Sequence, residues 1–261
     1  MSNIFFKSAV IGALSLLAYS AQADPLLPVQ NLTFSAYTGI APKGIFTAVD
    51  PVGWTGGTGL ISIDAPGTAT TVGGGGNAYA VYGPFSNPPP GGNFIQADGN
   101  PTFETSFNQV ITGLTAGTTY TLSFWQAAGQ QQGFSGATTE QWKVFFGDGS
   151  FSVDCTTNPC TTSTSGGTTE YDTAVMNTPS QGVSPWQEVS VNVLANAASD
   201  TLSFLAWGDN GNTTNLPPTV FLAGVNSPAL PEPTSLALVG VAFLGLALSR
   251  RGKRAKRNDA V

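Results

Sequence analysis

The feature that most limits the fold of this chain is a series of short runs in which apolar and polar residues alternate. One such run, TTYTLSFWQ, occupies Thr118–Gln126. In an extended strand it places Tyr120, Leu122 and Phe124 on one face. The other runs are Leu32–Tyr37, Leu60–Asp64, Asn93–Asp98, Phe103–Ile111, Gln141–Phe146, Glu188–Leu194, Asp200–Trp207 and Thr219–Val225. No stretch of useful length has helical periodicity, so we expect about nine strands in an all-β sandwich.

The segments between these runs are rich in glycine and proline, of which the chain has 32 and 18. Residues 66–76 and 86–92 are long loops of this kind, and 156–169, rich in Thr, Ser and Gly, is predicted to be a mobile excursion. With 41% hydrophobic residues and 16 Phe, the chain can still bury a core. We therefore expect one β-sandwich domain at residues 24–229.

The N-terminus has the pattern of an export signal. Lys7 supplies a positive charge, and AVIGALSLLA at Ala9–Ala18 is an apolar run of suitable length. Ala21–Ala23 reads AQA, a cleavage site with small residues at its ends. Residues 1–23 are thus predicted to be a signal peptide that is removed before Asp24.

The C-terminus combines three elements in order: Pro231-Glu232-Pro233, the apolar run LALVGVAFLGLAL at Leu236–Leu248, and a cluster of arginines and lysines. The apolar run makes a helix of roughly 20 Å, shorter than the hydrocarbon core, so flanking residues must extend it to about 234–249. The basic cluster at 250–261 predicts a cytoplasmic end.

This three-part tail resembles the PEP-CTERM sorting signals of Gram-negative bacteria, with the motif residues at Pro231, Glu232 and Pro233. The resemblance implies recognition by an exosortase, a membrane protease that processes residues 230–261 during export. It also implies a precursor held transiently in the inner membrane and a mature protein at the cell surface or in the extracellular matrix.

A second resemblance covers most of the remaining chain. The motifs GWTGG at Gly53–Gly57, ITGLTAGTTYTLSFW at Ile111–Trp125 and PPTVFLAGV at Pro217–Val225 occur in an order similar to that of galactose-binding-like and carbohydrate-binding modules. Trp186–Gly211 belongs to the same series. The resemblance implies a jelly-roll-type antiparallel β-sandwich. Leu222–Val225 reads LAGV, without the acidic residues usual in that last strand.

Two cysteines, Cys155 and Cys160, flank an Asn-Pro turn in CTTNPC. In an oxidising compartment their spacing predicts a disulfide that closes a short loop. Zinc binding would need about four ligands, and the chain has no histidine and no other cysteine.

Charge and composition exclude several functions. Between Asp24 and Leu230 the chain has 13 acidic residues and two lysines, so nucleic-acid binding is not expected. Without histidine, a Ser-His-Asp triad cannot form. Catalysis would need a carboxylate pair for glycoside hydrolysis. The candidates are Glu104, Glu140, Glu170 and Glu188.

Sugar binding is favoured, because it needs aromatic faces and neutral hydrogen-bonding groups. The predicted ligand-binding residues are Trp54, Tyr82, Trp125 and Trp207, with Tyr79 beside them in a loop region. Some of the five tryptophans must be core residues, and we expect Trp142 and Trp186 to be these.

The function predicted from these features is that of an exported, non-enzymatic surface or matrix protein that binds polysaccharide. The alternatives are a glycoside-active enzyme with two carboxylates and a purely structural envelope protein. No cofactor is expected. Calcium is the alternative there, at the turns Gly147–Asp154 and Trp207–Asn212, although both also read as ordinary turns.

Overall fold

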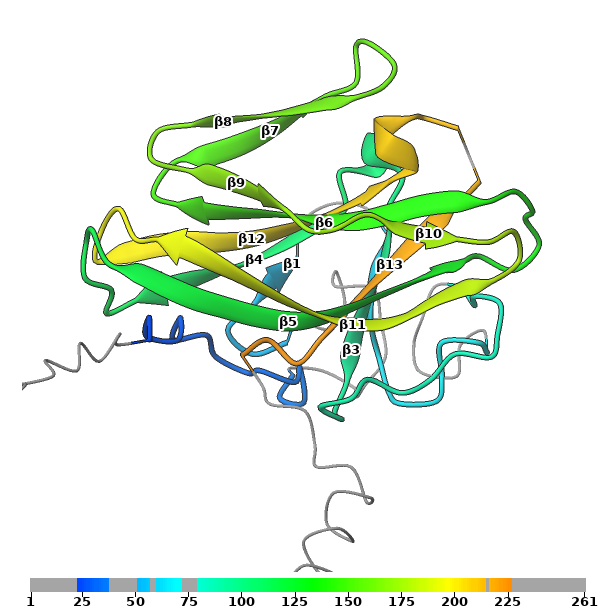
Figure 1. Cartoon of the computed structure of the whole chain (residues 1–261), viewed down its shortest axis with the longest axis horizontal. Coiled ribbons are helices and arrows are strands. Elements are labelled where there is room, and N and C mark those ends of the chain that lie inside the picture. The colour runs from blue at the N-terminus through cyan, green and yellow to red at the C-terminus, as the bar shows by residue number, and fades with distance from the viewer. Residues whose placement is uncertain (1–22, 38–50, 57–59, 72–78, 215, 227–261) are drawn as a thin grey trace, which may run out of the picture.

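The computed structural model describes residues 23–37, 51–56, 60–71, 79–214 and 216–226, which form two antiparallel sheets packed face to face (Figure 1). Sheet I has the strand order β11-β5-β13-β3-β2. Its strands are β2 (Ile61–Asp64), β3 (Phe94–Asp98), β5 (Thr119–Gln130), β11 (Val183–Leu194) and β13 (Pro218–Ala223). Sheet II has the order β1-β4-β12-β6-β10, and β9 also pairs with β6. Its strands are β1 (Thr55–Gly56), β4 (Ser106–Thr112), β6 (Thr138–Gly147), β9 (Thr169–Asp172), β10 (Met176–Thr178) and β12 (Ser199–Gly208).

The strand order is that of a jelly roll. Eight strands in chain order, β3, β4, β5, β6, β10, β11, β12 and β13, divide into the rows β3-β13-β5-β11 and β4-β12-β6-β10. Except between β6 and β10, each strand is followed by one in the opposite sheet, which interleaves the two sheets as two Greek keys. The expected fold class, a jelly-roll-type antiparallel β-sandwich, is therefore confirmed.

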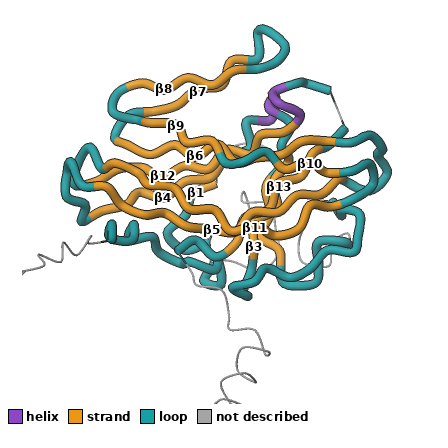
Figure 2. The backbone as a smooth tube through the Cα atoms, in the orientation of Figure 1, coloured by secondary structure: helices purple, strands orange, loops and turns teal. Residues whose placement is uncertain are grey.

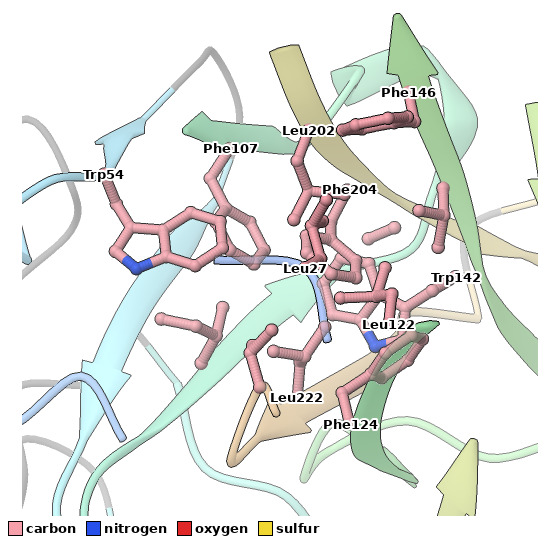
Figure 3. Packing of buried hydrophobic residues seen from close by; sticks show 14 of the residues in the cluster. Leu27, Trp54, Phe107, Leu122, Phe124, Trp142, Phe146, Leu202, Phe204 and Leu222 are labelled. Atoms are coloured by element: carbon pink, nitrogen blue, oxygen red, sulfur yellow. The ribbon is translucent and has the colours of Figure 1, made fainter. Parts of the chain in front are cut away.

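The main core lies between the sheets and follows the alternation of the sequence. On β5, Tyr120, Leu122 and Phe124 point inward and meet Trp142 and Phe204 from sheet II (Figure 3). The rings of Phe107 and Phe204 stack with centroids 5.2 Å apart. Aromatic rings in such contacts fill the space between the sheets with little loss of side-chain entropy.

Each sheet is also covered on its outer face. The cover hairpin, β7 (Ser150–Asp154) paired with β8 (Thr161–Ser165), lies over sheet II, at the top of Figure 2. The joining segment, by which we mean the described residues 65–71 and 79–93 between β2 and β3, contributes side chains that pack on the outer face of sheet I. Residues 156–169 were predicted to be a mobile excursion; instead they contain the tip of the hairpin and all of β8.

The first and the last described residues of the chain meet beside β5. Thr121 bonds the backbone of Pro25 and Leu27, and Asn226, at the end of the described chain, bonds Ser123 in both directions. The Asn226 side-chain amide also donates to the Leu27 carbonyl at 2.5 Å. β13 pairs with β5 only from Trp125 onward. The N-terminal segment and the last described residues thus bond the first half of β5, along the edge that β13 does not reach.

The prediction of a strand at Leu32–Tyr37 is wrong. Asn31 and Phe34 both have φ near +52°, and Phe34 donates to the Asn31 carbonyl, so this segment is a turn with Phe34 buried in the core. The other eight expected strands are present. β4 begins later than expected, because Pro101–Phe103 forms a 3-10 turn (η1).

The predicted signal peptide and C-terminal tail lie outside the described residues. Within the described part of the chain, no helix is long and apolar enough to cross a bilayer.

Candidate functional site

The candidate site is built on the outer face of sheet I. Residues that alternate with the core positions of its strands, Phe94, Trp125, Ala127 and Phe221, form an aromatic cluster there. The joining segment adds further side chains: Ala69, Tyr79, Val81 and Phe85. Phe85 and Phe221 have ring centroids 4.4 Å apart, so the joining segment is held to the sheet by aromatic contacts.

Beside this cluster lies a hollow of about 310 Å³, lined by Pro84, Phe85, Ser86, Val183, Ser184 and Pro185. We call it the aromatic hollow. Trp186 stands next to it, with its ring centroid 5.7 Å from that of Phe85 and its Nε1 donating to the Ser86 carbonyl at 2.8 Å. The pairing of β11 with β5 shifts register between Ser184 and Gln187. Such a bulge redirects side chains, and here it coincides with Trp186.

The walls of the aromatic hollow are uncharged. Residues 79–93 and 183–187 contain no acidic or basic residue. Phe85 and Trp186 are half-buried, so part of each ring remains accessible. The hollow therefore combines apolar ring and proline surfaces with the exposed Ser86, whereas the hydroxyl of Ser184 donates to the Asn177 carbonyl at 2.9 Å.

A buried polar group lies on the same outer face. Asp64 accepts a hydrogen bond from Ser62 at 3.0 Å, whereas its Oδ2 has no partner among the described residues. Gln96 donates to the Tyr79 carbonyl, and its Oε1 is likewise without a partner there. Burial raises the pKa of Asp64 to about 7 and that of Asp98 to about 6.

On the outer face of sheet II, the cover hairpin closes the corresponding surface. Phe151 of β7 stacks on Phe145 of β6, with centroids 4.1 Å apart. Leu205, Trp207 and Cys160 complete this smaller apolar cluster. Lys143 lies beside it, paired with Glu170 and Asp172 and 5.0 Å from the centre of the Trp207 ring.

Two of the predicted ligand-binding tryptophans are buried. Trp54 is 3% exposed and belongs to the main core, where its ring lies 5.2 Å from Phe107 and its Nε1 donates to the Gln30 carbonyl (Figure 3). Trp207 is 5% exposed. It does point away from the main core, as alternation predicts, but the cover hairpin closes over it. The structure thus gives both residues packing roles in place of the expected open faces.

The other two predicted residues are more accessible. Trp125 is half-buried on the outer face of sheet I and pairs across the sheet with Glu188. Tyr82 is half-buried, and its hydroxyl donates to the Phe134 carbonyl at 3.0 Å. Trp125 packs against the aromatic cluster, so it lies on the same face as the aromatic hollow.

Sequence reasoning did not find Phe85 and the prolines of the hollow, and it assigned Trp186 to the core. Trp142 is a core residue as expected, fully buried with its Nε1 donating to the Phe221 carbonyl at 3.0 Å. Trp186 is half-buried instead. In the sequence, both aromatic residues directly follow a proline, in Pro84-Phe85 and in Pro185-Trp186. Because proline is typical of turns and strand starts, this pattern could have indicated rings outside the core.

The predicted disulfide is confirmed: Cys155 and Cys160 are joined, with their Cα atoms 4.3 Å apart. It closes the tip of the cover hairpin. Cys160 donates its backbone N–H to the Gly211 carbonyl, which fixes this tip against the turn that follows β12.

The two turns considered for calcium are ordered parts of the fold. Asp209 of η2 (Asp209–Gly211) accepts from the Thr139 N–H at 3.2 Å and lines a second hollow of about 270 Å³. In the described ranges, no group of three or more His, Cys, Asp or Glu residues could hold a metal ion. Calcium binding at these turns stays a prediction.

The four candidate carboxylates occupy different environments. Glu140 is buried between the sheets, accepts from Thr138 and Thr178, and has its pKa raised to about 8, chiefly by burial. Glu170 pairs with Lys143. Glu188 is exposed on β11, and Glu104 ends the η1 turn with φ of 48°.

Comparison with known proteins identifies the C-terminal signal. Residues 229–251 match the model of the PEP-CTERM protein-sorting motif. The chain thus carries this motif, with Pro231, Glu232 and Pro233 inside the match, although these residues lie outside the described part of the structure. The motif implies an exported protein whose precursor is anchored in the membrane and processed by an exosortase.

The search of curated proteins gave no match to the sequence. Among solved structures, the chain is similar to TmCBM61 in complex with β-1,4-galactotriose, at 12% identity over 76% of this chain and 94% of that one, with a TM-score of 0.37. It is also similar to the enzymatically active domain of bacteriophage CBA120 tailspike protein 4, at 11% identity over 66% and 19% of the two chains (TM-score 0.34). A family 16 carbohydrate-binding module is similar at 13% identity over 57% and 84% (TM-score 0.27).

Proposed function

We propose that the mature protein is a non-enzymatic component of the cell surface or extracellular matrix that binds a neutral polysaccharide in the aromatic hollow. The observation that carries this proposal is the hollow itself. It is lined by Phe85, two prolines and two serines, and the partly accessible ring of Trp186 stands next to it.

The chemistry of the hollow suits a sugar. A pyranose ring has apolar C–H faces, which stack on aromatic rings, and a rim of hydroxyl groups, which need hydrogen-bonding partners. Phe85 and the adjacent Trp186 supply the rings, while the exposed Ser86 supplies a polar group in the lining. Because the walls are uncharged and the body of the protein is acidic, we expect neutral glycans to bind better than anionic ones.

The distribution of carboxylates supports a binding protein over a glycosidase. A glycosidase holds two carboxyl groups on either side of the sugar. None of the four candidate glutamates lines the aromatic hollow. Glu140 is inside the sandwich and Glu170 is engaged with Lys143, so neither is offered to a substrate there.

The test is retention of the processed protein in gels that contain defined neutral or anionic polysaccharides. We expect Phe85→Ala and Trp186→Ala to weaken retention by ~1–3 kcal/mol, the scale for loss of an aromatic anchor. Phe103→Ala, at a partly exposed aromatic outside the hollow, is the matched control and should bind normally. Equal retention of all variants would contradict the site, and release of sugars from the bound glycan would contradict a non-enzymatic role.

The destination is tested separately. We propose that the tail beyond the neighbourhood of Pro233 is removed in a Gram-negative host that has an exosortase, and that the mature protein leaves the inner membrane. Replacing Pro231-Glu232-Pro233 by three alanines should leave the full-length form in the inner membrane. Fractionation with intact-mass analysis in hosts with and without the protease measures this, and an attached tail in both would contradict it.

A further inference from the structure

The side chains of Lys143, Glu170 and Asp172 form a compact charge cluster between β6 and β9. Lys143 and Asp172 are directly opposite each other in the antiparallel pair, and Glu170 is opposite Phe145, one position along the same face. The Lys143 Nζ lies 3.2 Å from both carboxylate oxygens of Asp172 and also contacts Glu170 Oε1. The amine is thus equally far from the two oxygens of Asp172 and makes a bidentate contact with this carboxylate.

The Lys143 side chain is buried beside apolar residues. The Lys143 side chain is 10% exposed. Leu205 is its cross-strand neighbour on β12, and the Trp207 ring lies 5.0 Å from Nζ. An apolar surrounding disfavours charged groups, so exchange of an ammonium–carboxylate pair for an amine and a carboxylic acid costs less there than in water.

Glu170 is held in place from the other side. Both of its carboxylate oxygens accept from the Thr162 hydroxyl of β8, at 2.8 and 2.9 Å. Glu170 therefore stands between the cover hairpin and the amine, in a position to take and return protons. Asp172 differs, because its side chain is 49% exposed and so has an open path for a departing water molecule.

We infer that Lys143 and Asp172 condense to an intramolecular amide, with Glu170 as the proton-transfer residue. Lys143 gives a proton to Glu170, which passes it to the Asp172 carboxylate. The free amine then attacks the Asp172 carboxyl carbon and forms the C–N bond. Glu170 removes a proton from this nitrogen and returns it to the departing hydroxyl, which leaves as water. One ammonium and one carboxylate become one amide and one water, and Glu170 ends ionised as it began.

Two features of the site favour this step. Opposed strands hold the reacting groups at contact distance, which removes the entropy cost of bringing them together. Burial also raises the pKa of Asp172 despite the nearby Lys143 ammonium, which favours the protonated acid that the attack requires. Lysines in apolar sites are established nucleophiles towards carbonyl carbon.

The bond would close the chain covalently between residues 143 and 172, the segment that contains the whole cover hairpin. Together with the Cys155–Cys160 disulfide, it would fix both the tip of the hairpin and the strands on which it stands.

The experiment is a peptide map of the processed wild-type protein, denatured and reduced. The expected result is a branched peptide that joins Lys143 to Asp172, no tryptic cleavage after Lys143, and an intact mass lower by one water. Full mass with cleavage after Lys143 would overturn the proposal. So would a branch to Glu170, or a water loss that maps to the Asp148-Gly149 sequence, where a succinimide has the same mass.

Variants test the roles. Lys143→Arg keeps the positive charge and Asp172→Ala removes the acceptor, and both should have the full mass. Glu170→Gln keeps a group that can bond Thr162 but cannot carry the proton, so it should remain largely unlinked. Asp154→Asn, at an exposed acid on the cover hairpin, is the matched control and should be linked as in the wild type. A water loss that persists in Lys143→Arg would overturn the assignment. Because the wild-type map decides the main question, a variant that fails to fold leaves the test intact.

Discussion

The two outer faces of the sandwich start from the same sequence pattern and end differently. Each presents residues that alternate with core positions, including a tryptophan: Trp125 on sheet I and Trp207 on sheet II. Over sheet II the cover is a regular hairpin, and Trp207 is closed off beneath it. Over sheet I the cover is an irregular segment, and Trp125 stays half-exposed beside the aromatic hollow. The type of cover, and not the strand pattern, decides which face remains open.

The physical reason lies in the backbone of each cover. A hairpin satisfies its own hydrogen bonds, so it can lie flat on apolar side chains. In the described part of the joining segment, strand-like pairing is limited to one isolated bridge between Val81 and Gln131, and several of its carbonyls accept from side chains. Gln96 bonds Tyr79, Gln132 bonds Val81 and Trp186 bonds Ser86. Contacts at separate points leave gaps between them, and the aromatic hollow is one such gap.

Buried charge follows the same division. On sheet II the buried Lys143 has two carboxylates beside it. On sheet I, Asp64 and Asp98 are buried with no basic residue among their described partners, and their pKa values are raised. The carboxylates of the closed face thus have a lysine beside them, whereas Asp64 and Asp98 of the open face have no basic partner among the described residues.

The largest expected effect separates the two tryptophans. Trp207→Ala removes a buried ring from under the cover hairpin and should lower the free energy of unfolding by about 3–5 kcal/mol. Trp186→Ala, at the open face, should cost much less, because that ring is only half-buried. Urea unfolding of the two variants measures the difference. Equal losses would mean that the two covers seal their faces equally well.

Removal of the disulfide at the tip of the cover hairpin tests how much this bond contributes to closing the outer face of sheet II. The double variant Cys155→Ser, Cys160→Ser opens a short loop and should cost about 2 kcal/mol in the chain-entropy picture. Reduction of the wild type should give the same loss in thermal unfolding. No change in either would show that the apolar contacts of Phe151 and Trp207 hold the hairpin alone.

The uncompensated carboxylates of the open face predict a pH dependence. Because the pKa of Asp64 is raised in the folded state, that state binds more protons than the unfolded chain between its ordinary value near 4 and about 7. Stability from this group is present below pH 4 and is lost as the pH rises through 7. Asp64→Asn should flatten the fall by about 1–2 kcal/mol. Urea unfolding at several pH values checks this, with Glu188→Gln, at an exposed acid on β11, as the control.

The smallest effect is expected for Trp125→Ala. The side chain covers part of the aromatic cluster but is half-exposed, so its loss should cost about 1 kcal/mol. Calorimetry of this variant beside Trp207→Ala completes the comparison. A loss as large as that of Trp207 would show that Trp125 is a packing residue despite its exposure.

Much of the fold was accessible from the sequence because alternation states directly which residues face inward. Eight expected strands are present, and Leu122, Phe124 and Leu202 are buried as predicted. The failure at Leu32–Tyr37 has a local cause. Asn31 and Phe34 adopt left-handed backbone conformations, which interrupt the strand. Phenylalanine rarely adopts this conformation, so the sequence does not predict the turn.

The candidate site was harder to predict from the sequence. Alternation indicates that a side chain points away from the core, but it does not indicate which segment then covers that side chain. Trp207 was correctly placed on an outer face, yet the second strand of the cover hairpin that buries it, β8, is a Thr/Ser run without apolar alternation. The burial of Trp54 could not be predicted for a related reason: the strand that follows it, Thr55–Gly56, is too short to show a period. Trp186 depends on a register shift that sequence cannot locate.

The position of the last described strand has a mechanical consequence. A precursor held by its C-terminal tail receives any drag on the folded body as tension, and in the described part of the chain that tension reaches the sheets through β13. This strand lies between β5 and β3. A pull along it loads the hydrogen bonds to both neighbours in shear, whereas the same pull on an edge strand would load the bonds to one neighbour only. The jelly-roll order thus places the point of traction on a strand that resists force from both sides.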